Sequence, residues 1–128
     1  MTDKQIKILL VEDYLEEREA FRDVLDNPEY TFFEAENAPK ALLLLERETF
    51  DVLIVDIGLG GMNGLELVRQ ARARQLTSAP VIVITGEPNP IFQKEARELK
   101  VFRYFIKNQL VNSVLRDAVT EAISGVTE

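Results

Sequence analysis

The stretch DVLIVD, residues 51–56, sets four apolar residues between two aspartates. Short apolar runs bounded by turn or polar residues are typical of strands buried on both faces of a parallel sheet. Three other runs have this form, at residues 8–11, 81–84 and 101–106. Each of the four runs has a polar, chemically active side chain at or just past its end. These side chains are Glu12 and Asp13, Asp56, Thr85 and Lys107.

Segments with apolar residues at helical spacing separate these runs, which is the pattern of βαβ units. The first helix follows the first strand and must end before Pro28. We expect a weaker strand at 31–35, near a sheet edge, and helices at 38–48, 63–75, 90–99 and from Leu110 to near residue 124, before a short C-terminal tail. The sequence therefore predicts an α/β fold of the doubly wound (βα)5 type, a five-stranded parallel sheet with strand order 2-1-3-4-5.

The carboxyl ends of the first and third strands carry the acidic residues. With this strand order they flank the switch point of the sheet, where ligands of such folds bind. Three neighbouring carboxylates repel one another, and without a cation at least one is pushed toward protonation. Magnesium (Mg²⁺) accepts carboxylate oxygens and completes its shell with water and phosphate oxygens. Glu12, Asp13 and Asp56 therefore predict a site for Mg²⁺ and a phosphoryl group.

The residue types at this edge are sufficient for phosphoryl transfer. An aspartate beside the cation can attack phosphorus and carry the phosphoryl group as an acyl phosphate. Lys107 would place a positive charge on one phosphoryl oxygen, and Thr85 would offer its hydroxyl to another. Such a transfer depends on positioning and charge neutralisation, so it needs no histidine.

Each of these residues also has a purely structural interpretation. Asp13 stands three residues before Glu16, the spacing of a helix N-terminus, so it could be a cap rather than a ligand. Asp56 could begin a turn, Thr85 could simply end a strand, and a lone Lys107 could be solvated. The functional interpretation is favoured because all of these groups are expected at one edge of the sheet.

Composition limits the possible functions. The 128 residues suit one domain, and the absence of cysteine and histidine removes disulfides, thiolate chemistry and imidazole catalysis. The net charge of −7 argues against nucleic-acid binding by this domain. No stretch is apolar over the roughly 20 residues of a membrane span, and no signal peptide is evident, so we expect no membrane association and a cytoplasmic location.

Other phosphate-handling motifs fit less well. A phosphatase of the haloacid dehalogenase type would have a second aspartate two residues after the nucleophile, where this chain has Gly58. The G-x-x-x-x-G-K-[ST] motif is absent, and Asn63 breaks the G-x-G-x-x-G spacing counted from Gly58. The glycines at 58, 60, 61 and 64 are better interpreted as a flexible loop whose backbone approaches the ion and the phosphate.

Five motifs together resemble the receiver domain of two-component response regulators, over essentially residues 1–128. They are Leu10-Val11-Glu12-Asp13, Leu53-Ile54-Val55-Asp56, Gly61-Met62-Asn63-Gly64-Leu65-Glu66-Leu67, Ile84-Thr85-Gly86 and Tyr104-Phe105-Ile106-Lys107. The resemblance implies a flavodoxin-like three-layer sandwich, and the strand order given above is in part what this resemblance implies. It also implies a phosphoacceptor signalling domain and not an enzyme, beyond self-catalysed phosphorylation and dephosphorylation.

The resemblance implies a role for each matching residue. Asp56 resembles the phosphoacceptor, Asp13 a direct Mg²⁺ ligand, Glu12 an acidic partner acting through metal-bound water, and the Gly58 backbone carbonyl the third protein ligand. Thr85 and Lys107 resemble the pair that senses the phosphoryl group, and Tyr104 the aromatic residue that turns inward on activation.

Implied partners are a histidine kinase or histidine phosphotransfer protein, which supplies the phosphoryl group, and an output domain or separate effector. That output would contact the surface formed by the fourth helix, fifth strand and fifth helix. The domain would be a monomer or a weak, phosphorylation-dependent dimer. Two other functions stay open: a pseudo-receiver that acts as an interaction module without phosphorylation, and a metal-dependent phosphatase.

The chain departs from the family pattern at two positions. Gly60 stands where many relatives have proline, so we expect a more mobile loop. Asn108 follows Lys107 where most relatives have proline and a cis peptide bond. A cis bond before a residue other than proline costs about 2.5–4 kcal/mol, so we expect a trans Lys107-Asn108 bond and a looser Lys107. We also expect Asn108 to cap the last helix.

Overall fold

The computed structural model describes residues 5–125, in which five strands alternate with five α-helices. The strands are β1 (Ile6–Val11), β2 (Tyr30–Ala35), β3 (Val52–Asp56), β4 (Val81–Thr85) and β5 (Arg103–Ile106). The helices are α1 (Leu15–Val24), α2 (Ala38–Arg47), α3 (Gly64–Ala73), α4 (Pro90–Glu98) and α5 (Asn112–Ser124), with a short 3₁₀ turn, η1 (Lys107–Gln109). All strands are parallel and lie in the order β2-β1-β3-β4-β5, as the sequence predicts. The predicted C-terminal tail beyond residue 125 lies outside the described residues.

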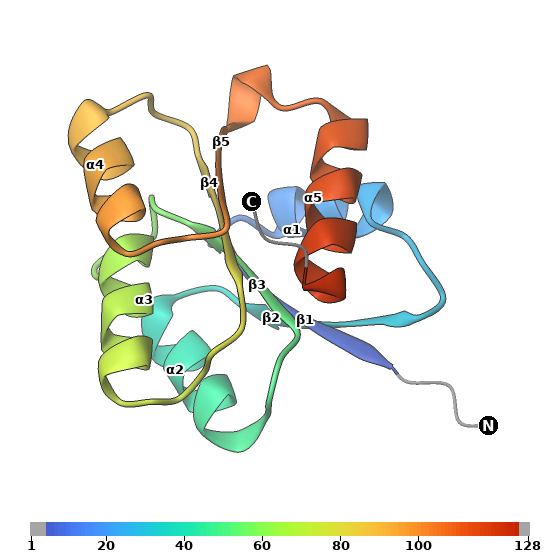
Figure 1. Cartoon of the computed structure of the whole chain (residues 1–128), viewed down its shortest axis with the longest axis horizontal. Coiled ribbons are helices and arrows are strands. Elements are labelled where there is room, and N and C mark those ends of the chain that lie inside the picture. Colours follow the sequence, from blue (N-terminus) through green and yellow to red (C-terminus); the bar gives the residue numbers. More distant parts are fainter. Residues whose placement is uncertain (1–4, 126–128) are drawn as a thin grey trace.

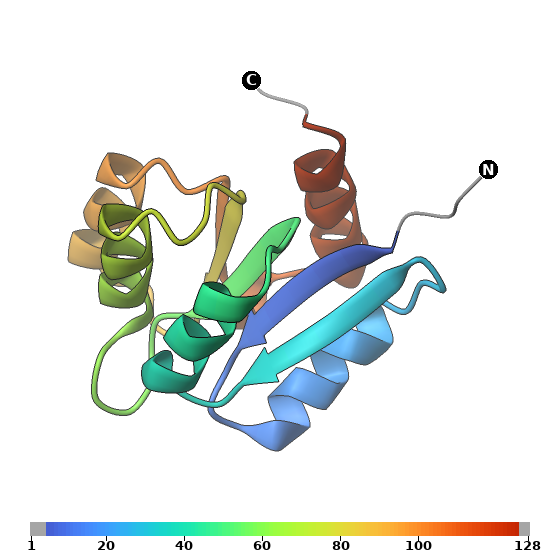
Figure 2. The same cartoon turned by 90° about the horizontal axis from the view of Figure 1, so that it is seen from below.

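The sheet forms the middle of three layers (Figures 1 and 2). Helices α2, α3 and α4 cover one face, and α1 and α5 cover the other. Side chains alternate along β3, so Leu53 and Val55 pack toward α2–α4 while Val52 and Ile54 pack toward α1 and α5. This two-sided burial explains why the central strands are almost wholly apolar. Within residues 5–125, no helix is long and apolar enough to cross a membrane.

Three asparagines fix where the helices on one face of the sheet begin. The side-chain oxygens of Asn37, Asn63 and Asn89 accept hydrogen bonds from backbone N–H groups in the first turns of α2, α3 and α4. Such caps satisfy N–H groups that have no partner within the helix. The caps therefore set the entry points of these helices, including the one that follows the acidic end of β3.

The last helix begins later than its apolar pattern predicts. Residues Lys107–Gln109 form the η1 turn, and α5 begins only at Asn112. Leu110 has an extended backbone and still packs into the core beside α5. In the sequence it therefore looks like the first apolar residue of the helix, although it precedes α5. The prediction that Asn108 caps α5 is wrong, because Val111 occupies the N-cap position. No cis peptide bond occurs among the described residues, so the Lys107-Asn108 bond is trans, as predicted.

Gly64 is not part of a flexible loop, in contrast to the sequence interpretation. It is buried at the first position of α3, and its N–H donates to the carbonyl of Ile57 at 3.0 Å. A Cβ atom there would lie 2.2 Å from the carbonyl oxygen of Asp56 and 2.7 Å from Cγ1 of Val55. Only glycine therefore lets α3 start this close to the end of β3.

We predict that Gly64→Ala destabilises the fold even though alanine favours helices. The added methyl group must displace the backbone at Asp56, so the free energy of unfolding should fall by about 1–3 kcal/mol. Gly60→Ala is the matched control, because a Cβ at Gly60 meets nothing within 4 Å, and it should change stability by less than about 1 kcal/mol. Urea unfolding measures both. Equal stability of Gly64→Ala and the parent would contradict the packing argument.

Candidate functional site

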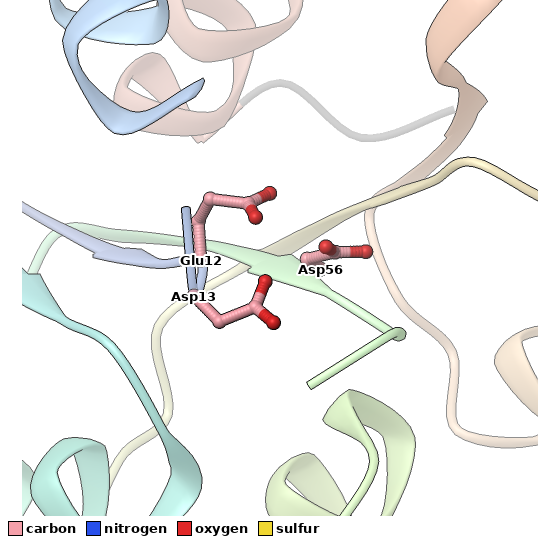
Figure 3. A group of neighbouring side chains, drawn as sticks. All are labelled: Glu12, Asp13 and Asp56. Carbon is pink, nitrogen blue, oxygen red and sulfur yellow. The ribbon is translucent and has the colours of Figure 1, made fainter. Parts of the chain in front are cut away.

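The acidic residues converge at the carboxyl ends of β1 and β3. Val11 pairs with Val55 in the sheet, so the residues that follow, Glu12 and Asp56, emerge side by side. With Asp13 they offer carboxylate oxygens that all lie within 4.8 Å of one another (Figure 3). Glu12 is 1% exposed and Asp56 is 7% exposed. Three carboxylates from two strand ends thus share one small space.

Asp56 is held by a turn and still presents one oxygen to the site. Its Oδ1 accepts a hydrogen bond from the N–H of Gly58 at 3.1 Å. The turn interpretation of Asp56 is therefore correct, and it is compatible with a functional one. The turn fixes the carboxylate plane, which leaves Oδ2 directed at a partner across the site.

Asp13 does not cap α1. Tyr14 occupies the N-cap position without a side-chain cap, and its N–H donates to Oε2 of Glu12 at 3.2 Å. Oδ1 of Asp13 is buried and has no hydrogen-bond partner within the described residues. A buried oxygen without a donor is costly unless a ligand satisfies it. Together with the two neighbouring carboxylates, this oxygen suits a divalent cation.

Lys107 reaches into the acidic cluster from the end of β5. Its Nζ donates to Oε1 of Glu12 at 3.0 Å and to Oδ2 of Asp56 at 3.2 Å. It also donates to Oε1 of Glu17, a residue of α1. The lysine is therefore aimed at the site across a trans peptide bond. The looser Lys107 expected without a proline at position 108 stays a prediction.

Glu17 was missed by the sequence analysis. It lies in the first turn of α1, which begins at the acidic edge. A long acidic side chain in that turn was the available signal. The sequence could not distinguish it from its neighbour Glu16, because the choice depends on the rotation of α1 about its axis.

The ion pairs decide the charge of the lysine. Burial by itself would lower the pKa of Lys107, but its contacts with Glu17, Glu12 and Asp56 outweigh burial and raise that pKa above its usual range. The ammonium group is therefore fully charged at neutral pH.

The pKa of Glu12 is strongly shifted by its surroundings. Burial and the negative charge of Asp56 raise the pKa of Glu12 to about 8, although hydrogen bonds from Lys107 and the N–H of Tyr14 act in the opposite direction. This is the effect expected when like charges share a buried site. The folded chain therefore holds a proton that the unfolded chain has already released.

The raised pKa of Glu12 predicts how the free energy of unfolding depends on pH when no metal is bound. The pKa of Glu12 is about 8 in the folded chain and 4.5 for an ordinary glutamate. Its contribution to the free energy of unfolding is therefore fully present below pH 4.5 and is lost as pH rises to 8. With EDTA present, the free energy of unfolding should fall across this range, and Glu12→Gln should flatten the slope. The chain has no histidine, so few other side chains titrate between pH 6 and 8. Parallel slopes for parent and variant would contradict the assignment.

Thr85 and Tyr104 flank the cluster on β4 and β5. Thr85 is 3% exposed, and its Oγ1 accepts from the N–H of Glu87 at 3.2 Å. The hydroxyl oxygen of Tyr104 is buried without a hydrogen-bond partner among the described residues, and burial raises the pKa of Tyr104. Thr85 therefore lies at the same edge as the carboxylates, while Tyr104 pairs with Val83, two residues earlier along β4. The Gly58 carbonyl as a metal ligand stays a prediction.

The comparisons with known proteins agree with this geometry. A family model for the response regulator receiver domain matches residues 8–120. The chain belongs to this family. Receiver domains are signalling domains, and the matched residues include the edge that holds the acidic cluster.

Relatives with and without additional domains resemble this receiver domain. Chemotaxis protein CheY of Pseudomonas aeruginosa is 33% identical over 104 residues, which cover 80% of this chain and 84% of that protein. The alginate biosynthesis transcriptional regulatory protein AlgB of the same species is 32% identical over 106 residues, which cover 83% of this chain but only 23% of that protein. The chain thus spans most of one relative and about a quarter of the other.

One solved structure of a relative contains ligands. It is a response regulator protein from Burkholderia pseudomallei with a phosphorylated aspartic acid, calcium ion and citrate. It is 26% identical to this chain with a TM-score of 0.77, and the match covers 94% of this chain and 71% of that one.

Proposed function

We propose that this receiver domain accepts a phosphoryl group on Asp56 from a histidine kinase or a histidine phosphotransfer protein. The observation that carries the proposal is the position of Asp56 Oδ2, which faces the Lys107 ammonium at 3.2 Å while Oδ1 is fixed by the N–H of Gly58. A nucleophile beside a fixed positive charge suits attack on an anionic phosphoryl group. The phosphorylated aspartic acid in the Burkholderia relative supports the same chemistry here.

Mg²⁺ is the proposed cofactor. Glu12, Asp13, Asp56 and the Gly58 carbonyl would hold it, and the unpartnered Oδ1 of Asp13 and the raised pKa of Glu12 fit a cation bound among these oxygens. When bound, the ion would neutralise negative charge on the phosphoryl oxygens. The calcium ion in the Burkholderia relative is consistent with a divalent cation in such a domain.

The protein residues then have distinct roles in the transfer. An Asp56 carboxylate oxygen forms the new bond to phosphorus while the bond between phosphorus and the donor's histidine nitrogen breaks, and the electron pair leaves with the imidazole. Lys107 binds one phosphoryl oxygen by a charge-assisted hydrogen bond. The Thr85 hydroxyl donates to another, and Tyr104 on the neighbouring strand β5 turns inward in response.

The output of the switch would be the surface of α4, β5 and α5, where Tyr104 lies against α4. The partner is either an output domain of a longer protein or a separate effector, since relatives of both lengths resemble the chain. We assign no catalysis on outside substrates, only self-catalysed phosphorylation and dephosphorylation. The cytoplasmic location and the monomeric or weakly dimeric state stay predictions.

We predict stoichiometric labelling by a small phosphodonor such as acetyl phosphate, dependent on Mg²⁺. Asp56→Asn keeps the shape of the side chain and removes the anionic oxygen, so it should abolish labelling and leave the circular dichroism spectrum unchanged. Asp117→Asn, an exposed aspartate of α5, is the control of equal charge and should label like the parent. Intact-protein mass spectrometry measures the bound phosphoryl group.

Other outcomes of this experiment identify other functions. Unchanged labelling of Asp56→Asn would show that another residue is the acceptor. A parent protein that takes no label would indicate a pseudo-receiver, and sustained turnover of many phosphodonor molecules would indicate a phosphatase.

A further inference from the structure

One hydrogen-bond partner of Lys107 lies outside the acidic cluster of Glu12, Asp13 and Asp56. An ammonium group has three N–H donors, and here they face Glu12, Asp56 and Glu17. The first two residues belong to the cluster, whereas Glu17 reaches in from α1. All three donors are therefore in use before any phosphoryl group arrives.

A phosphoryl group on Asp56 takes the place of the Asp56 carboxylate as one partner of Lys107. Its remaining negatively charged oxygens then compete for the two donors that face Glu12 and Glu17. The side chain of Glu12 is 2% exposed, so losing the lysine would take a hydrogen-bond partner from a buried group that water cannot reach. The side chain of Glu17 is 40% exposed, so water can solvate its carboxylate after release. Exposure therefore selects Glu17 as the contact that breaks.

The surroundings of Glu17 leave room for this movement. A groove of about 210 Å³ lies beside the ion pair, between α1 and the η1–α5 segment. Its lining includes Glu17 and Lys107 together with the apolar side chains of Phe21, Val24 and Leu110. The Glu17 side chain therefore borders open space beside Lys107 and is not enclosed by the core.

We propose that Glu17 is an internal competitor for Lys107, a positioning residue whose carboxylate the phosphoryl group on Asp56 must displace. The contact lowers the affinity of the site for a phosphoryl group, and its release frees α1 from the η1 turn. The inference rests on the proposed function of Asp56. It adds a regulating contact to that site.

Beryllium fluoride, a phosphoryl mimic, tests the competition in the presence of Mg²⁺. Glu17→Gln removes the competing charge and should lower the dissociation constant for the mimic by about fivefold, as expected for loss of an ion pair worth about 1 kcal/mol. Glu17→Asp keeps the charge but is one methylene shorter, so it should lose the contact and also bind more tightly than the parent.

Glu16→Gln is the matched control. Glu16 lies in the same first turn of α1, is exposed, and has no ion pair or hydrogen bond within the described residues, so the variant makes the same charge change beside the site. Its dissociation constant should stay within about twofold of the parent value. Carboxyl ¹³C NMR gives a second readout: on addition of the mimic to the parent, the signal of Glu17 should shift toward the value of a solvated glutamate, and that of Glu16 should not.

The possible failures are distinct. A parent protein that binds no beryllium fluoride contradicts the proposed function of Asp56 and this inference with it. Binding by the parent with equal or weaker binding by Glu17→Gln overturns the inference alone. Tighter binding by Glu17→Gln but not by Glu17→Asp also overturns it, because the effect would then come from charge near the site and not from the contact with Lys107.

Discussion

The ion pairs of Lys107 are the interaction on which the functional edge depends. One ammonium group at the end of β5 contacts carboxylates from β3, α1 and the residue just past β1. Without it, the buried carboxyl groups of Glu12 and Asp56 would lose a charged hydrogen-bond donor that water cannot replace, which is destabilising. The strand order makes the contact possible, because β4 sets β5 one strand away from β3 and on the same carboxyl edge. The strand order of the sheet therefore also brings the lysine to the carboxylates.

The positive and negative charges at this edge do not balance. One positive charge faces the carboxylates of Glu12, Asp13, Asp56 and Glu17, so negative charge is in excess. Burial and the negative charge of Asp56 raise the pKa of Glu12, and the Oδ1 of Asp13 has no hydrogen-bond partner within the described residues. A divalent cation would relieve both, and a phosphoryl group would then compete for the lysine.

The sequence correctly predicts the strands that are buried on both faces. It does not predict features that depend on the rotation of a helix or on the close approach of two backbone segments. The runs of β1, β3 and β4 are readable because both faces of these strands are covered, and the reactive residues stand at their ends. The start of α5 was misplaced, because Leu110 packs into the core from a non-helical segment. Gly64 was interpreted as a source of flexibility, whereas it permits close packing of α3 on β3. Glu17 could not be singled out, because helix rotation is not encoded in local spacing.

A crystal structure of the chain with Mg²⁺ and beryllium fluoride tests the central claim most directly. The account predicts the fluoroberyllate on an Asp56 carboxylate oxygen, Lys107 Nζ within hydrogen-bond distance of a fluorine, and the cation bound by Asp13 at about 2.1 Å. It also predicts that the Glu17 carboxylate has left Lys107 and faces solvent. A fluoroberyllate on another residue, or a cation bound away from Asp13 and Asp56, would contradict the account.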